Sequence, residues 1–185
     1  MGKKPTSVII ALTGPKHCGK TETGKALADL SGGTFLDLDT VAEELSGISP
    51  RELYKKGRDL FQEAETGAVS EVLRRASEDP GLYIIAAGGG IIDNRRAFET
   101  LKQSAVLVYL DIIEETAWKR IEAASSGGLP AFLEGAENPK QAHGELHRRR
   151  SGLYKNHAEI TLSAENKDPA GISAEIWDII KVRYL

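Results

Sequence analysis

The feature that most limits how this chain can fold is a run of eight residues near its start that contains two glycines. The run reads Gly14-Pro15-Lys16-His17-Cys18-Gly19-Lys20-Thr21 and matches the pattern G-x-x-x-x-G-K-[ST] at every position. An apolar segment precedes the run and a helical pattern follows it, so we predict a strand, a tight loop and a helix in that order. The backbone N–H groups of such a loop and the positive N-terminal end of such a helix point at one anion.

The residues of this loop have different expected roles in binding ATP and Mg²⁺. The two glycines let the backbone curl, and the four residues between them contribute through backbone N–H groups rather than through their side chains. Lys20 is expected to reach the β- and γ-phosphates and to be catalytic, and the Thr21 hydroxyl is expected to ligate Mg²⁺. All eight residues are therefore assigned to the nucleotide site.

Apolar runs alternate with helical patterns along the chain, which is typical of a parallel sheet covered by helices on both faces. We expect strands at Val8–Thr13, Thr34–Leu38, Leu82–Ala87, Ala105–Leu110 and Ile160–Leu162. We expect helices at Lys20–Leu30, Val41–Leu45, Pro50–Arg75, Arg95–Gln103, Ile113–Ala124 and Ala170–Val182. We assign neither a strand nor a helix to residues 136–159. No repeat or linker divides the chain, so residues 1–185 are expected to form one three-layer α/β domain.

The segment Ser125–Gly135 fits neither pattern, because glycine, serine and proline are frequent in it. A segment of this composition inside a compact domain is usually functional or mobile. We expect it to belong to a mobile active-site lid that spans about residues 123–143. A plain surface loop is the alternative.

Composition limits the partners and the compartment. The formal net charge of -3 and the absence of a long basic run argue against nucleic acid as a partner. The single cysteine, Cys18, cannot form an internal disulfide, which favours a reducing compartment. No apolar stretch approaches the roughly 20 residues that span a bilayer. We therefore expect a cytoplasmic monomer that acts on a small molecule.

Other polar positions suggest an acceptor site at the carboxyl edge of the sheet. If Asp37 and Asp39 close the second strand, their carboxylates point to the same side, toward the edge where α/β folds bind ligands. One would serve the magnesium shell and the other a substrate hydroxyl, with two solvated turn residues as the alternative. Gly88–Gly90 would let a ligand approach the main chain, or would form a tight turn. Arg150 has the planar fork that suits a carboxylate, or is a solvated helix charge.

In this order, the motifs resemble those of the shikimate kinase family over nearly the whole chain. One motif would be weak evidence, but several in register are specific. The matching segments are Gly14–Thr21, Phe35–Asp39, Gly57–Glu65, Ala87–Gly90, Val108–Asp111 and Arg150-x-x-Leu153-Tyr154. The resemblance implies a nucleoside-monophosphate-kinase-like P-loop fold with five parallel strands. It also implies a substrate-binding helical segment at about residues 40–75 and a mobile lid.

The same resemblance implies an activity, the transfer of the γ-phosphoryl group of ATP to the 3-hydroxyl of shikimate. It implies that Asp37 supports the magnesium ion together with Thr21. Arg120 falls where the family places an arginine near the adenine, so we assign Arg120 to the nucleotide site.

The resemblance also assigns residues to the acceptor. It implies that Asp39 holds the acceptor hydroxyl and accepts its proton. Gly88, Gly89 and Gly90 are implied to line the substrate pocket. Arg150 is implied to bind the substrate carboxylate in the catalytic site.

Three positions depart from the family pattern. Gln62 stands where the family has one arginine of the carboxylate clamp, Leu129 where the lid has an arginine, and Arg58 where the family has a glutamate. Residues 58 and 62 are four apart on a predicted helix and share one face. We therefore assign both to the substrate site and expect Arg58 to replace the missing clamp arginine. Arg148 or Arg149 would replace the lid arginine.

Three functions remain open on this evidence. The first is a shikimate kinase with a rearranged clamp. The second is a kinase of the same fold that acts on another small hydroxylated metabolite, which the loss of an arginine would suit. The third is a nucleotide-binding protein with weak or no transfer activity, which the missing lid arginine favours. The complete phosphate loop and the two aspartates favour transfer.

Overall fold

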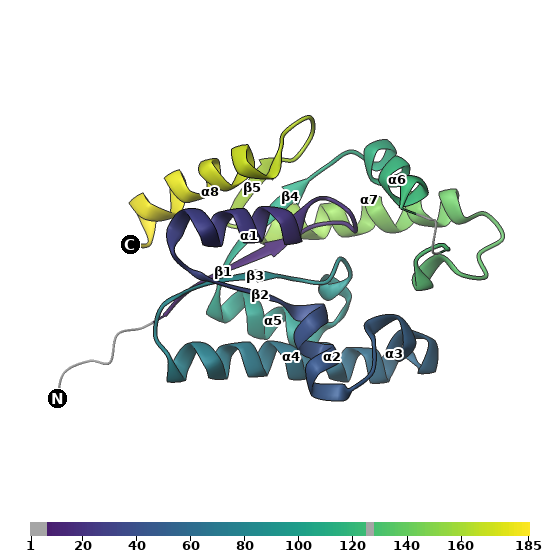
Figure 1. The fold of residues 1–185 in the computed structure, drawn as a ribbon. Coiled ribbons are helices and arrows are strands. Elements are labelled where there is room, and N and C mark those ends of the chain that lie inside the picture. The colour runs from purple at the N-terminus through teal and green to yellow at the C-terminus, as the bar shows by residue number, and fades with distance from the viewer. Residues whose placement is uncertain (1–6, 125–127) are drawn as a thin grey trace.

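Five parallel strands form the centre of the molecule and determine where the other elements lie. The computed structural model describes residues 7–124 and 128–185. The strands lie in the order β2-β3-β1-β4-β5 (Figure 1). Their bounds are β1 Val8–Thr13, β2 Thr34–Asp37, β3 Leu82–Ala86, β4 Val106–Asp111 and β5 Ile160–Ser163. Because β1 has β3 on one side and β4 on the other, the loop after β1 lies at the switch point where such sheets bind ligands.

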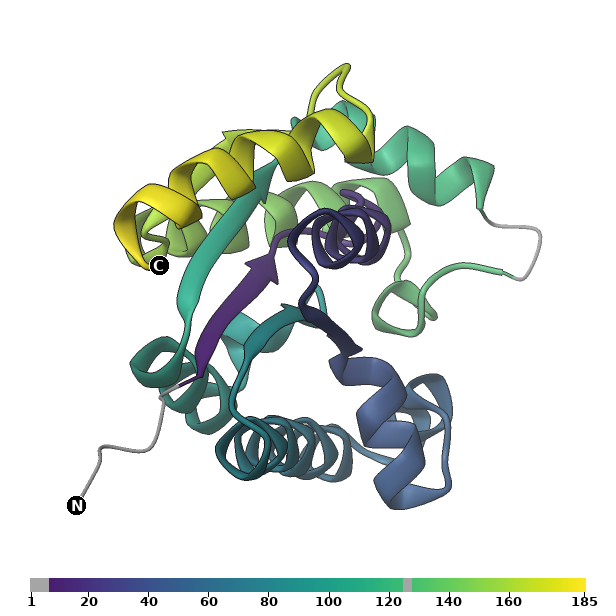
Figure 2. The same cartoon turned by 60° about the vertical axis from the view of Figure 1, so that its left-hand side comes forward.

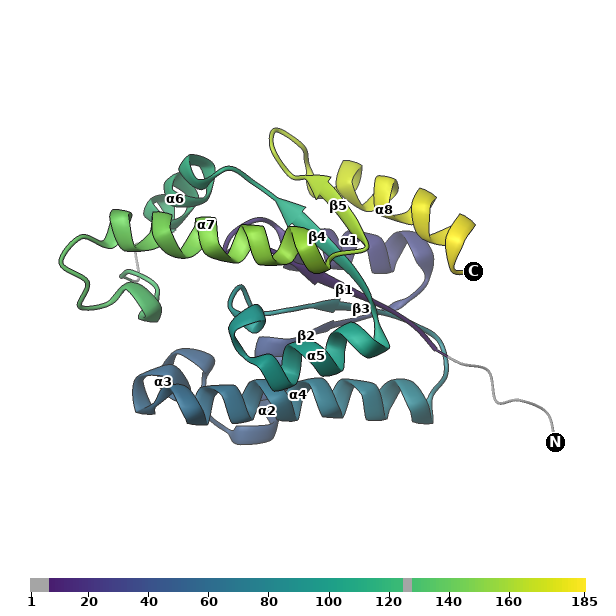
Figure 3. The same cartoon turned by 180° about the vertical axis from the view of Figure 1, so that it is seen from behind.

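Helices cover both faces of the sheet, as a parallel sheet requires. One face carries α1 Lys20–Ser31 and α8 Pro169–Arg183. The other face, seen in Figure 3, carries α2 Leu38–Ser46, α4 Arg58–Glu78 and α5 Arg95–Ser104. The remaining elements are α3 Pro50–Lys56, α6 Glu114–Ala123, α7 Pro139–His157 and the single turns η1 Ile91–Asp93 and η3 Ala131–Leu133. This arrangement confirms the expected three-layer α/β fold.

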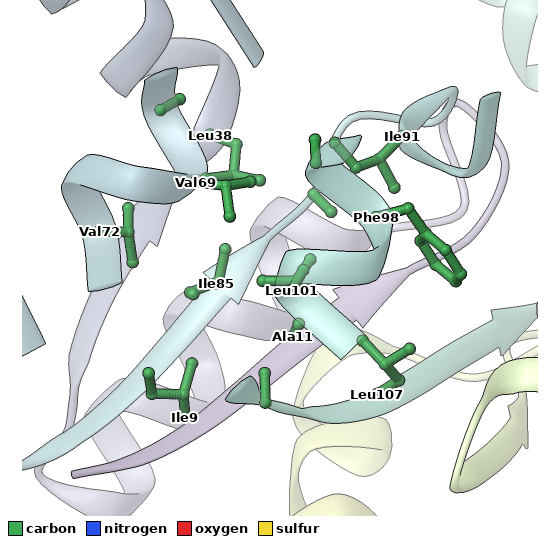
Figure 4. Close-up of a cluster of buried hydrophobic side chains, with 14 of the residues drawn as sticks. Ile9, Ala11, Leu38, Val69, Val72, Ile85, Ile91, Phe98, Leu101 and Leu107 are labelled. Atoms are coloured by element: carbon green, nitrogen blue, oxygen red, sulfur yellow. The ribbon is translucent and has the colours of Figure 1, made fainter. Parts of the chain in front are cut away.

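Alternate residues of β1 enter opposite cores, and this alternation produces the three layers. Ile9 and Ala11 pack in the cluster formed with α2, α4 and α5, which Figure 4 shows. Ile10 and Leu12 pack with α1 and α8 instead. Both faces of the strand are therefore dry, which explains why its sequence is apolar without alternation. Within the described residues, no helix is both long enough and apolar enough to cross a membrane.

A smaller cluster of buried side chains lies away from the sheet. Trp118 and Ile121 of α6 pack against Leu133 of η3, with Leu129 and Phe132 partly buried beside them. This cluster fixes residues 129–133 onto α6. Figure 2 shows η3 on the same side of the molecule as α2 and α3.

Most boundaries differ from the sequence prediction by one residue, and two differences bear on the site. β2 ends at Asp37, whose carboxylate caps α2 by accepting a hydrogen bond from the Asp39 N–H group at 3.0 Å. Asp39 therefore lies in the first turn of a helix rather than in a strand, because the cap satisfies a backbone donor that a strand would not leave open. The helical stretch expected at residues 50–75 is interrupted at Gly57 and continues to Glu78.

Helix α7 is the largest element that we did not predict. Its 19 residues include two glycines, and its buried residues are His143, His147 and Tyr154. The inward face is thus polar or aromatic, so the apolar period that marks most helices is missing. The expected lid at residues 123–143 falls partly on α7, and its residues 125–127 lie outside the described residues.

Replacement of Gly33 by alanine tests the close packing between the α1–β2 turn and β3. A Cβ atom at residue 33 would lie 2.9 Å from the Leu82 carbonyl oxygen and 2.5 Å from Ile84 Cδ1, so the backbone must shift. We expect Gly33→Ala to lower the free energy of unfolding by about 1–3 kcal/mol, measured in urea. Gly152→Ala is the control, because residue 152 lies inside α7 with nothing within 4 Å of a Cβ atom. It should raise stability by about 0.5–1 kcal/mol, and a loss in both variants would contradict the packing argument.

Candidate active site

The phosphate loop has the tight backbone that its glycines predict. Gly14 and Gly19 have φ angles of 144° and 99°, and His17 also has a positive φ, of 61°. A Cβ atom at Gly14 would lie 2.7 Å from the Leu110 carbonyl oxygen, so only glycine fits there. Cys18 is buried and packs with the core, whereas Lys16 and His17 line a cavity.

The cationic end of the loop faces the same cavity. Lys20 Nζ donates to the carbonyl oxygens of Gly14 at 3.0 Å and Pro15 at 2.8 Å. Arg120 of α6 donates from Nη1 to the His17 carbonyl oxygen at 3.0 Å and also lines the cavity. Burial and the neighbouring Lys16 lower the pKa of His17, so His17 is neutral at physiological pH. The structure thus brings Arg120 to the loop, as the nucleotide assignment requires.

Thr21 and Asp37 form an oxygen-rich pair beside the loop. The Thr21 hydroxyl donates to Asp37 Oδ2 at 2.9 Å, and Asp37 Oδ1 accepts the cap hydrogen bond of α2. Both residues line the cavity. A hydroxyl and a carboxylate are the hard ligands that Mg²⁺ prefers, and Mg²⁺ keeps several waters beside such a pair. These residues therefore suit the metal assigned to them.

A single cavity of about 640 Å³ joins the phosphate loop to the substrate-binding segment and to α7. Its acceptor end includes Asp39, Glu65, the glycines after β3 and Arg150. The residues that line it are Lys16, His17, Gly19, Lys20, Thr21, Glu22, Asp37, Asp39, Pro50, Arg51, Tyr54, Phe61, Glu65, Ala87, Gly88, Gly89, Gly90, Arg120, Pro130, Ala131, Phe132 and Arg150.

The three glycines after β3 allow the other parts of the site to approach the main chain. A Cβ atom at Gly88 would lie 3.3 Å from Asp39 Oδ1, and one at Gly90 would lie 2.9 Å from Arg150 Nη2. One at Gly89 would lie 3.0 Å from the backbone nitrogen of Lys16. Side chains here would therefore occupy the space between the phosphate loop and the acceptor end.

Two carboxyl groups at the acceptor end hold protons more strongly than usual. Burial raises the pKa of Asp39, and the negative charge of Asp37 raises it further. Burial also raises the pKa of Glu65 to about 7, against the hydrogen bond from Asn94 and with help from the charge of Asp39. Asn94 Nδ2 donates to Glu65 Oε2 at 3.2 Å, while Oε1 has no hydrogen-bond partner among the described residues.

Sequence reasoning assigned no role to Glu65 or to Arg51. Glu65 follows Phe61 by one helical turn on α4, and the shared face of these two cavity residues was the available signal. Arg51 of α3 lines the cavity and pairs with Glu134, which also pairs with Lys55 at 3.1 Å. An exposed arginine in a short helix carries no comparable signal.

Arg150 lies at the acceptor end, where several groups contact it. Its Nε and Nη2 atoms donate to Asp93 Oδ2 at 3.0 and 2.7 Å, and its guanidinium carbon lies 5.6 Å from the centre of the Phe132 ring. Arg149 donates to the other oxygen of Asp93 at 2.7 Å. The replacement of the lid arginine by Arg148 or Arg149 stays a prediction.

The structure does not bring the other expected clamp residues to the cavity. Arg58 is exposed at the start of α4 and is not among the residues that line the cavity in the described part of the chain. Gln62 is also absent from that lining, and its Nε2 donates to the Asp93 carbonyl oxygen at 3.2 Å. The helical spacing of the two residues was sound, but α4 turns that face toward η1 and solvent. Their direct contact with substrate stays a prediction without support from their positions.

The phosphate loop lies at the switch point of the sheet, and the cavity continues from it to an acceptor end that carries an arginine. These two features define a P-loop kinase of small molecules. A family model described as shikimate kinase matches residues 16–181. The chain therefore belongs to the shikimate kinase family.

Individual relatives agree over nearly the full length. The chain is 32% identical to the shikimate kinase of Moorella thermoacetica, covering 93% of this chain and 94% of that protein. It is 28% identical to the shikimate kinase of a Marinomonas species, covering 93% and 91%. A solved structure of shikimate kinase from Acinetobacter baumannii in complex with shikimate superposes with a TM-score of 0.82 at 28% identity, covering 97% of this chain and 96% of that one.

The raised pKa of Glu65 predicts how stability depends on pH. Folded Glu65 keeps its proton to about pH 7, whereas the unfolded chain releases it near 4.5. Between these values the folded state binds more protons, so its free energy of unfolding falls as pH rises. In Glu65→Gln this fall should disappear, and the variant should gain on the order of 2 kcal/mol relative to wild type between about pH 4.5 and pH 8.

Urea unfolding at a series of pH values measures this difference. Glu63→Gln on the exposed side of the same helix is the matched control and should follow wild type. Wild-type and Glu65→Gln stabilities that stay parallel over the whole range would show that Glu65 does not titrate as expected.

Proposed function

We propose that this protein transfers the γ-phosphoryl group of ATP to the 3-hydroxyl of shikimate. The observation that carries the proposal is that one cavity joins Lys20 of the phosphate loop to Asp39 and Arg150. Family membership supports the same acceptor, because a relative of 28% identity has been solved with shikimate bound.

The nucleotide end binds and neutralises the phosphates. Lys20 would exchange its loop carbonyl partners for oxygens of the β- and γ-phosphates, and backbone N–H groups of the loop would hold the others. Thr21 and Asp37 would hold Mg²⁺, which when bound supplies further neutralisation of phosphate charge. Arg120, anchored on the loop, would lie beside the nucleotide base.

The acceptor end positions and deprotonates the hydroxyl. The acceptor oxygen attacks the γ-phosphorus, the bond to the β–γ bridging oxygen breaks, and ADP leaves. The hydroxyl proton passes to the Asp39 carboxylate, whose raised pKa suits a group that must hold a proton. Arg150 would bind the carboxylate of the acceptor with two parallel hydrogen bonds. Gly88–Gly90 would lie against the ring.

A second acceptor class is favoured by one observation. The single negative charge of Asp93 offsets part of the positive charge of Arg149 and Arg150, which weakens the attraction of the site for an anion. A neutral polyol, or another small hydroxylated acid, is therefore the alternative acceptor for the same chemistry.

An ADP-release assay with shikimate and a panel of small polyols and hydroxy acids separates these functions. Turnover with shikimate at a kcat/KM well above that of every other compound supports the proposal. Higher turnover with another compound supports the second acceptor class. ATP binding by calorimetry without turnover of any acceptor would indicate a nucleotide-binding protein that does not transfer phosphate.

Lys20→Ala should abolish measurable kinase activity and weaken ATP binding, because it removes the cation fixed among the β- and γ-phosphates. The fall in kcat should be on the order of 10²-fold or more. Calorimetric ATP titration and the ADP-release assay measure the two effects. Lys25→Ala, on the exposed side of the same helix, should change neither. Undiminished ATP affinity and turnover in Lys20→Ala would contradict the phosphate role.

Asp39→Asn should lower kcat on the order of 10²-fold or more and leave ATP binding nearly intact. Asparagine keeps the size of the side chain but cannot accept the hydroxyl proton. Initial rates at saturating ATP and acceptor give kcat. Asp29→Asn, which changes an exposed residue of α1, is the control. Loss of ATP affinity with unchanged kcat would mean that Asp39 acts on the nucleotide instead.

A further inference from the structure

Asp93, at the end of η1, makes hydrogen bonds to two helices at once. Its carboxylate accepts from Arg150 of α7 through Oδ2 and from Arg149 through Oδ1. Its carbonyl oxygen accepts from Gln62 of α4. The Asp93 side chain is only 9% exposed, and Asp93 is not among the described residues that line the cavity. It therefore acts on the acceptor site through its neighbours.

The Arg150 guanidinium is held on three sides. Asp93 Oδ2 accepts from the edge formed by Nε and Nη2. Cζ of Arg150 lies 5.6 Å from the centre of the Phe132 ring. On the third side, a Cβ atom at Gly90 would be 3.3 Å from Cζ. Nη1 also donates to the Gly89 carbonyl oxygen at 3.4 Å. Three of the five N–H groups of Arg150 thus have partners in the described part of the chain. Because Asp93 occupies the Nε–Nη2 edge, the Nη1–Nη2 edge is the one left for a ligand, and Nη1 and Nη2 each have one N–H without a partner among the described residues.

The negative charge of Asp93 persists at all working pH values. Burial alone would raise the pKa of Asp93, but the charges and hydrogen bonds of Arg150 and Arg149 outweigh burial and lower it. The hydrogen bond from Gln62 fixes the backbone that carries this carboxylate. Gln62, which stands where the family has a clamp arginine, thus supports Arg150 indirectly, through its hydrogen bond to Asp93.

We propose that Asp93 is a positioning residue that presents the Nη1–Nη2 edge of Arg150 to the carboxylate of the acceptor. This inference rests on the proposed function, in which Arg150 binds that carboxylate. An arginine side chain loses rotamer entropy when it is fixed. If the hydrogen bonds from Asp93 order Arg150 before the acceptor binds, the acceptor does not have to supply the free energy for that ordering. A clamp with a single arginine depends on this preorganisation.

The experiment compares shikimate with its methyl ester, which has the same hydroxyls but no carboxylate charge. In Asp93→Asn, kcat/KM for shikimate should fall about tenfold or more, mainly through KM, because Arg150 is no longer held in place. The KM for ATP should not change, and kcat/KM for the ester should change less than twofold. Glu145→Gln, which removes an exposed carboxylate from α7, is the charge-matched control and should follow wild type.

A measurement on the wild-type protein covers the case in which Asp93→Asn fails to fold. The Nε–H group of Arg150 should give a nitrogen–proton resonance that exchanges slowly with water, because Asp93 accepts from it in a half-buried site. Arg150→Lys identifies the resonance by its absence. Fast exchange of this proton in wild type would overturn the inference.

The remaining outcomes separate the inference from the proposed function. Wild type that phosphorylates shikimate, with equal kcat/KM values for wild type and Asp93→Asn, would overturn the inference and leave the function intact. Equal losses for shikimate and ester would indicate a merely structural role and overturn it. A lower KM for shikimate in the variant would make Asp93 a competitor of the acceptor, which also overturns it. Wild type inactive on shikimate defeats both.

Discussion

The close packing of the bare Gly88–Gly90 backbone is the constraint on which the rest of the site depends. A Cβ atom added at any of these positions would come within 3.3 Å of another part of the site. The phosphate loop, α2, α4 and α7 are far apart in sequence, yet each approaches this one stretch of main chain. Phosphoryl transfer requires the reacting oxygen and phosphorus to start almost in contact. Side chains on these residues would separate the two ends of the cavity by more than that contact allows.

The charges of the cavity are adjusted by neighbours rather than by single residues. Asp37 helps to raise the pKa of Asp39, and Asp39 in turn helps to raise that of Glu65. Protonation of Glu65 removes a negative charge from the acceptor end, and that charge would oppose ATP and an anionic acceptor alike. Near Arg150 a positive charge is offset instead, because the carboxylate of Asp93 forms an ion pair with the guanidinium. The acceptor end is therefore close to neutral, and the orientation of its groups matters more than their total charge.

Local sequence was sufficient where chemistry demands fixed spacing and insufficient where tertiary packing decides. The phosphate loop was predictable because each of its positions has a conformational or chemical reason, and β1, β3 and β4 because their apolar runs are nearly continuous. Asp39 shows the limit: it reaches the cavity as expected, but from a helix, since a cap at the preceding aspartate outweighed the strand pattern. Helix α7 was missed because its buried face consists of His143, His147 and Tyr154. The Asp93 contacts join residues about 30 and 57 positions apart, which no spacing rule connects.

The packing of Trp118 against Leu133 has a consequence for observing the molecule at work. The chain has two tryptophans, and the other, Trp177, lies on α8 and packs against the core cluster that the sheet forms with α1 and α8. With Trp177 replaced by phenylalanine, the remaining indole emission would come from the contact between α6 and η3 alone. Its wavelength and its quenching by iodide would then report, without any attached dye, whether η3 leaves α6 while ligands enter and products depart.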